Sequence, residues 1–162
     1  MTSSAPIPSL IAALVTAART IPNLDVSDSY STLNTGWDGG ARVMLAVGVD
    51  DPDRPFRAQS ATSTATAVTV GGARPGFDES VEVVCHLHAE AGTVDAAIPR
   101  EAAYAARDAL RDLLAAHRPI APTLAIPGGW RVFLSGERLF QAQFETGASA
   151  DLFLTISCTA RT

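Results

Sequence analysis

Residues 136–162, GERLFQAQFETGASADLFLTISCTART, decide most of what the fold can be, because apolar and polar side chains alternate along them. The last part of this stretch has an apolar residue at every second position, namely Leu152, Leu154, Ile156, Cys158 and Ala160. The positions between them include Asp151, Thr155, Ser157 and Thr159. A period of two residues is typical of a strand that buries one face. The stretch therefore predicts a strand whose aliphatic face covers a core.

The strand predicted just before it carries apolar side chains on one face and long polar side chains on the other. Phe140, Ala142 and Phe144 alternate with polar residues, which are Gln141, Gln143 and Glu145. A row of two amides and a carboxylate either faces water or bonds to a neighbouring copy, so these three are our candidate contacts with another subunit or with a tube. A turn at residues 146–149 is predicted to join the two strands. The resulting hairpin carries no catalytic group, which indicates assembly.

The rest of the sequence predicts an α+β fold. Apolar stripes at helical spacing predict helices, and alternation predicts strands. The helices are expected at residues 9–20 and 99–117, the strands at 24–30, 42–49 and 130–134, and a long hairpin at 59–90. We expect an antiparallel or mixed sheet, with both helices packed on one face and the long hairpins used for oligomer contacts. The predicted core beneath the helices is Val83, Cys85, Leu87, Leu152, Leu154 and Ile156.

Length and charge restrict the class of protein. A chain of 162 residues with no internal boundary predicts a single domain over 1–162. Its formal net charge is −5 and its basic residues, all Arg, are scattered, which argues against nucleic-acid binding. No apolar stretch reaches the ~20 residues of a membrane span, and the apolar stretch at 7–18 lacks the basic flank of a signal peptide. We therefore expect a soluble intracellular protein that makes no contact with a membrane.

One short motif suggests a metal. Cys85-His86-x-His88 holds zinc-ligand residue types, but on a strand Cys85 faces away from both histidines, and the sequence offers no second ligand pair. We interpret His86 and His88 as residues of an exposed strand face and predict no metal site. Cys85 and Cys158 are expected to be small core residues, and a disulfide between them is left open.

The other motifs give equally weak evidence for a binding or catalytic site. The glycine pairs at 39–40, 71–72 and 128–129 do not have phosphate-binding spacings. The acidic residues Asp50, Asp51 and Asp53 lack the glycine and distal Glu of a calcium loop. No Ser or Cys stands in a recognisable nucleophile elbow. The sequence thus predicts no catalytic residue and no cofactor, and it disfavours an enzyme.

Several segments, taken in order, resemble the tail terminator (tail-completion) proteins of long-tailed, non-contractile bacteriophages, especially those that infect actinobacteria. They are DSYSTLNTG at 28–36 before a Val-rich strand, VGVDD at 47–51, DESVEVVC at 78–85, the Ala/Arg-rich helix around 100–114, and the closing Gln141-x-Gln143, Gly147-Ala148, Phe153 and Ala160-Arg161. With the N-terminal helix, the resemblance spans nearly the whole chain, and the order of the segments carries it.

The resemblance implies a structural, non-enzymatic subunit of a hexameric ring at the tail–head junction of the virion, assembled in the host cytoplasm. Such a ring caps the tail tube, ends its polymerisation and joins the tail to the head. The implied partners are other copies of the chain, the tail tube protein and the head completion or connector protein, and DNA passes through without specific binding. The alternatives are a head-side neck subunit, a tail-tube subunit, or a small soluble ligand-binding module.

The acidic loop has two interpretations in such a ring. Asp50, Asp51 and Asp53 lie beside Pro52 and Pro55, which would stiffen the loop. As a lining of the DNA channel, these carboxylates would repel the passing phosphates. As an outer loop, they would serve solubility alone.

Overall fold

The computed structural model describes residues 7–28, 42–49, 61–70, 74–117 and 130–161. Two helices and six strands lie in these ranges, and the fold is α+β, as predicted. The elements in chain order are α1 (Ile7–Ala18), β1 (Asp25–Asp28), β2 (Arg42–Val47), β3 (Ala61–Val70), β4 (Arg74–Ala91), α2 (Ala97–Ala116), β5 (Arg131–Phe144) and β6 (Gly147–Arg161). Neither of these helices is long and apolar enough to cross a membrane.

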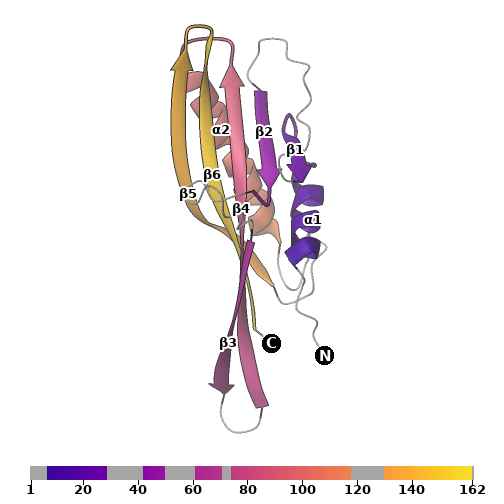
Figure 1. Cartoon of the computed structure of the whole chain (residues 1–162). Coiled ribbons are helices and arrows are strands. Elements are labelled where there is room, and N and C mark those ends of the chain that lie inside the picture. The colour runs from indigo at the N-terminus through magenta and orange to yellow at the C-terminus, as the bar shows by residue number, and fades with distance from the viewer. Residues whose placement is uncertain (1–6, 29–41, 50–60, 71–73, 118–129, 162) are drawn as a thin grey trace.

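The long strand β4 organises the sheet. The strand order is β1-β2-β4-β6-β5, with β1 parallel to β2 and the other pairs antiparallel. One edge of β4 is shared by two strands, because β2 pairs with its residues 85–90 and β3 with its residues 74–83. Between them, the carbonyl of Val84 accepts hydrogen bonds from the N–H groups of Gly48 and Val49, at 2.9 and 3.0 Å. The β3–β4 hairpin therefore continues one end of the sheet beyond the helices (Figure 1).

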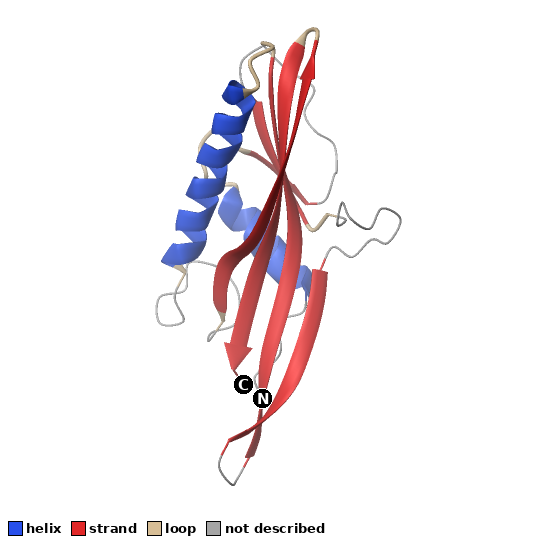
Figure 2. Cartoon of the chain, turned by 90° about the vertical axis from the view of Figure 1, so that its left-hand side faces the viewer, coloured by secondary structure: helices blue, strands red, loops and turns tan. Residues whose placement is uncertain are grey.

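Both helices cover one face of the sheet. Figure 2 shows α2 running along that face, and Leu10 and Leu14 of α1 belong to the same core cluster as Leu45 and Val47 of β2. The predicted core is confirmed: Val83, Cys85, Leu87, Leu152, Leu154 and Ile156 are each at most 1% exposed. Burial of an aliphatic side chain contributes ~1.5–3 kcal/mol, so this face holds most of the packing energy.

The helix α2 begins close to the predicted position. Asp95, two residues before the first residue of α2, accepts a hydrogen bond from the N–H of Ala97 through Oδ1 at 3.0 Å, and Ala96 occupies the cap position itself. Farther along, Arg107 binds both carboxylate oxygens of Glu137 on β5, at 2.8 and 3.0 Å. This ion pair fastens the outer strand of the sheet to the helix.

The C-terminal hairpin differs from the prediction in two ways. Residues 130–134 and the following strand form one continuous strand, β5, because a bulge at Ser135 shifts the register between Leu134 and Gly136 without ending the pairing. The turn is also shorter than expected, since only Glu145 and Thr146 leave the ladder and β6 already begins at Gly147. A side chain at Gly147 would place its Cβ 2.6 Å from the carbonyl oxygen of Ala91, so glycine allows this close approach.

The other face of the sheet, called the open face below, is the side turned away from α1 and α2. It carries the second set of alternating residues, which are Glu82, Val84, His86, His88 and Glu90 of β4 and Asp151, Phe153 and Thr155 of β6. Most of these side chains are only half-buried. Groups that can do chemistry in water therefore gather on the open face.

Candidate functional site

A polar cluster lies on the open face where β4 pairs with β6. The register places His88 opposite Asp151 and His86 opposite Phe153. As a result, both histidines reach one carboxylate oxygen: His86 Nε2 lies 2.8 Å and His88 Nδ1 lies 2.6 Å from Asp151 Oδ1. The three side chains are 15%, 26% and 29% exposed for His86, His88 and Asp151. We call these three residues the His–Asp cluster.

A second contact holds each histidine ring. The ring of His86 stacks on Phe153, with centroids 4.3 Å apart and planes inclined by 4°, and Phe140 packs its edge against Phe153 at 5.9 Å. The other nitrogen of His88, Nε2, lies 3.6 Å from Glu90 Oε2. The cluster is therefore oriented by its neighbours before any ligand arrives.

The electrostatics of the cluster favour ionised groups. The hydrogen bond to Asp151 raises the pKa of His88 above its ordinary value; burial opposes this, while the charges of Asp151 and Glu90 support it. Burial alone would raise the pKa of Asp151, but the hydrogen bonds from His86 and His88 outweigh burial and lower that pKa well below its usual range. Asp151 is thus a carboxylate at any physiological pH, with a readily protonated histidine beside it.

The alternation along β4 puts both histidines on the face opposite Cys85, as predicted, but it does not reveal the third member of the cluster. Cys85 is buried on the helix-covered face, as expected, and burial raises the pKa of its thiol to about 12, so it does not join the cluster. Asp151 was assigned to the polar face of its strand, which is also correct. Only the β4–β6 register reveals that this polar face is the one that carries His86 and His88.

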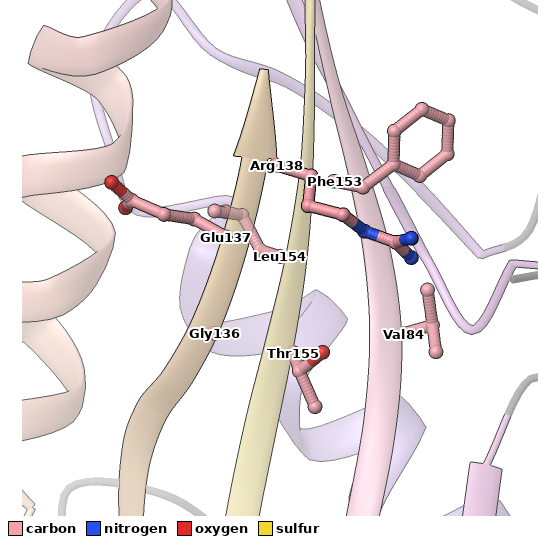
Figure 3. A pocket seen from close by; sticks show the side chains of 7 residues that line it. All are labelled: Val84, Gly136, Glu137, Arg138, Phe153, Leu154 and Thr155. Carbon is pink, nitrogen blue, oxygen red and sulfur yellow. The ribbon is translucent and has the colours of Figure 1, made fainter. Parts of the chain in front are cut away.

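A small pocket lies beside the cluster and shares Phe153 with it (Figure 3). Its volume is about 200 Å³, and it is lined by Val84, Gly136, Glu137, Arg138, Phe153, Leu154 and Thr155. It opens where Gly136, just after the bulge, has no side chain, and the guanidinium of Arg138 extends from β5 across β6 toward β4. Pockets for drug-sized ligands measure roughly 300–1,000 Å³. This hollow beside the cluster is thus smaller than a pocket of that kind.

The other candidates from the sequence are placed differently. Gln141 and Gln143 turn to the helix side, where their amides donate hydrogen bonds to the carbonyls of Ala96 and Val94, at 3.3 and 2.8 Å. Glu145 is exposed in the turn. A contact of these three residues with another subunit stays a prediction. Asp50, Asp51 and Asp53 lie outside the described residues.

The two cysteines are free and buried in the core. Cys85 pairs with Leu154, whereas Cys158 pairs with Val81. Four residues of a strand separate these positions, which is about 13 Å at the usual rise per residue. A disulfide requires the two Cα atoms to be within about 7 Å. The disulfide left open by the sequence is therefore incompatible with this register.

A row of aromatic side chains follows the outer strand. Phe133, Phe140 and Phe144 of β5 are 46%, 49% and 59% exposed. Phe133 pairs with Ser157, Phe140 with Asp151 and Phe144 with Gly147, so all three lie on the open face. We call them the phenylalanine row. They stand seven and four residues apart along β5, so they mark its open face at intervals rather than as one continuous patch.

Comparison with known proteins gives no assignment. No family model matches the chain, and no curated protein matches its sequence significantly.

Proposed function

We propose that the chain is a structural subunit of a hexameric ring at the tail–head junction of a long-tailed, non-contractile bacteriophage. The ring would cap the tail tube, end its polymerisation and offer a surface to the connector of the head. The ordered resemblance of nearly the whole sequence to tail terminator proteins supports this proposal. The architecture supports the part of it that concerns assembly.

Two long strand edges carry the argument for assembly. Within the described part of the chain, β5 pairs only with β6, and β3 pairs only with β4. Their 14 and 10 residues present rows of backbone N–H and C=O groups at the rim of the sheet. Long unprotected edges invite pairing with another chain, and monomeric proteins usually shorten or cover them. Strand pairing between copies of the chain would satisfy the backbone groups of these edges.

The two edges are also different, as a ring requires. In a closed ring each subunit contacts its neighbours head to tail, so one surface meets a second, unlike surface. The β3–β4 hairpin projects from one end of the molecule, and β5 forms the outer edge of the main sheet (Figure 1). We propose that the hairpin of one subunit lies against β5 of the next, where the phenylalanine row would be covered.

The remaining parts of the proposal follow from the resemblance and from charge. The partners would be other copies, the tail tube protein and the head completion or connector protein. A formal charge of −5 per chain becomes 6 × −5 = −30 in a hexamer, which fits a body that DNA passes through without binding. Asp50, Asp51 and Asp53 stay our candidates for the channel lining, with a solvated outer loop as the alternative.

Solution mass and electron microscopy test the proposal. Six copies of the 16.9 kDa chain give a particle of about 101 kDa. We expect light scattering to give this mass and negative-stain images to show rings with a central hole. A monomer or dimer at every concentration would overturn the ring, and open stacks of unlimited length would indicate a tube subunit instead.

A matched pair of variants tests the proposed interface. Phe144→Asp places a charge in the phenylalanine row, whereas Val94→Asp places one on a residue that is equally exposed, at 59% and 57%, outside that row. We expect Phe144→Asp to release folded monomers, which keep the circular dichroism spectrum of the parent, and Val94→Asp to keep the ring. Equal behaviour of the two variants would show that the row is not the interface.

A further inference from the structure

We propose that the His–Asp cluster binds one divalent transition-metal ion, and that Zn²⁺ suits it best. The ligand atoms would be His86 Nε2, His88 Nδ1 and an oxygen of Asp151. This proposal replaces the expectation of no metal, which was reached from Cys85-His86-x-His88 alone. It is independent of the ring, because all three ligands come from one chain.

The geometry of the three groups is close to that of a metal site. Their ligand atoms all lie within 4.8 Å of one another, and the two nitrogens are 2.8 and 2.6 Å from the same oxygen. In a tetrahedral zinc site with bonds of ~2.0–2.1 Å, neighbouring ligand atoms are about 3.3 Å apart. Small rotations of the side chains open that space without moving the strands.

The ligand types select the ion. Two imidazoles and one carboxylate suit zinc and similar transition metals. Calcium and magnesium prefer sites made of oxygen atoms alone. With neutral imidazoles, the carboxylates of Asp151 and the adjacent Glu90 carry two negative charges, which a divalent cation balances.

The surroundings would hold the ligands in place. A histidine that binds a metal usually donates its other N–H to a carboxylate, which fixes the tautomer and the ring orientation. Glu90 Oε2, 3.6 Å from His88 Nε2, is placed for this role, and Phe153 fixes the ring of His86 by stacking. In register beside His88 and His86 on β2 are Met44 and Ala46, which are buried and give the site an apolar wall.

The bound ion would join two strands that are distant in sequence. Its ligands come from β4 and β6, so it would clamp the centre of the sheet on the open face. Three protein ligands leave one tetrahedral position. Because the side chains are 15–29% exposed, water can reach that position. Such a clamp should make the folded chain more stable when zinc is present. An ion that binds only the folded state raises the free energy of unfolding.

Nuclear magnetic resonance of the unaltered protein gives the first test. The chain has three histidines, and the third, His117, is buried at the end of α2, away from the cluster. After removal of metals with a chelator, we expect one equivalent of Zn²⁺ to shift the ring resonances of His86 and His88 and to leave those of His117 unchanged. No shift of the cluster resonances, or equal shifts of all three histidines, would overturn the proposal.

Calorimetric titration of variants gives the second test. Asp151→Asn and His88→Gln should abolish measurable binding, and Glu90→Gln should weaken it by roughly 10- to 100-fold. Glu82→Gln is the matched control, because it removes a carboxylate from the same strand and the same face outside the cluster. Binding that is the same in Asp151→Asn and Glu82→Gln would place the metal elsewhere. If a variant fails to fold, the magnetic-resonance titration of the unaltered chain still decides the proposal.

Discussion

The two faces of the β4–β6 pair are built by alternate residues of the same two strands, yet different forces determine them. On the helix-covered face, Val83, Cys85 and Leu154 are excluded from water by α1 and α2. On the open face, His86, His88 and Asp151 acquire their properties from each other across the strands. Burial on the covered face follows from the apolar type of each residue. The hydrogen bonds and pKa values on the open face follow from which residue lies opposite on the neighbouring strand. Four pairs of substitutions test this contrast.

The largest effect is expected on the covered face. Leu154 is 1% exposed, so Leu154→Ala should lower the free energy of unfolding by ~2–5 kcal/mol, because the lost burial is followed by a cavity. Its neighbour Thr155 faces the open side and is half-buried, and Thr155→Ala should change stability by no more than ~1 kcal/mol. Urea unfolding measures both. Equal losses would mean that the assigned faces are wrong.

The next effect comes from two glycines of the C-terminal hairpin. Gly147→Ala would press a methyl group against the carbonyl of Ala91 at 2.6 Å, whereas a methyl group at Gly136 would meet Thr155 only at 3.8 Å. We expect Gly147→Ala to destabilise by ~1–3 kcal/mol, as overpacking does, and Gly136→Ala to be nearly neutral. Thermal melts compare them, and the reverse order would contradict the close approach of β6 to Ala91.

The third effect depends on pH and concerns the metal-free protein in chelator. The pKa of His88 is raised by folding, so its contribution is full below its unfolded pKa of about 6.5 and is lost as the pH rises through the raised folded value. The pKa of Asp151 is lowered by folding, so its contribution is full above its unfolded pKa of about 3.9 and is lost on acidification.

The two contributions therefore overlap between about pH 4 and pH 6.5. In that window Asp151→Asn should be less stable than the parent by ~1–2 kcal/mol, because hydrogen bonds to a charged group are lost. The difference should shrink toward alkaline pH. Urea unfolding at a series of pH values measures it, with Glu82→Gln as the control for charge. A difference that grows above neutrality would refute the ion pair.

The smallest effect is expected at Gln143, a polar residue on the helix side. Its amide donates to the carbonyl of Val94 at 2.8 Å, and Gln143→Ala should cost ~0.5–1.5 kcal/mol. Glu145→Ala, in the adjacent turn, should cost almost nothing in the isolated chain. If Gln143→Ala left stability unchanged but weakened the ring, the amide would serve assembly, as the sequence first suggested.

The amino-acid pattern predicts the structure well where burial alone determines it. The alternation of β4 and β6 and the apolar stripes of α1 and α2 predicted the core and the α+β fold. The same pattern does not reveal features in which a residue acts through a partner that is distant in the chain. The bulge at Ser135 is held by a hydrogen bond of 2.6 Å that Ser157 Oγ donates to Ser135 Oγ, and nothing local in the sequence marks it. The His–Asp cluster was missed for the same reason, since 63 residues separate His88 from Asp151.

The position of β6 has a consequence for how the chain folds. It lies between β4 and β5, so the middle of the sheet is supplied by the last strand described, and its partner residues on β4 are far away in sequence, as Asp78 and Arg161 are. Contacts between distant residues form slowly, because a long loop must close first. The β3–β4 hairpin can form early, but β4 remains without its inner neighbour until residues 147–161 have been synthesised. During translation, therefore, one whole edge of β4 stays without its partner until β6 has been made, while β2 and β3 can already pair with the other edge.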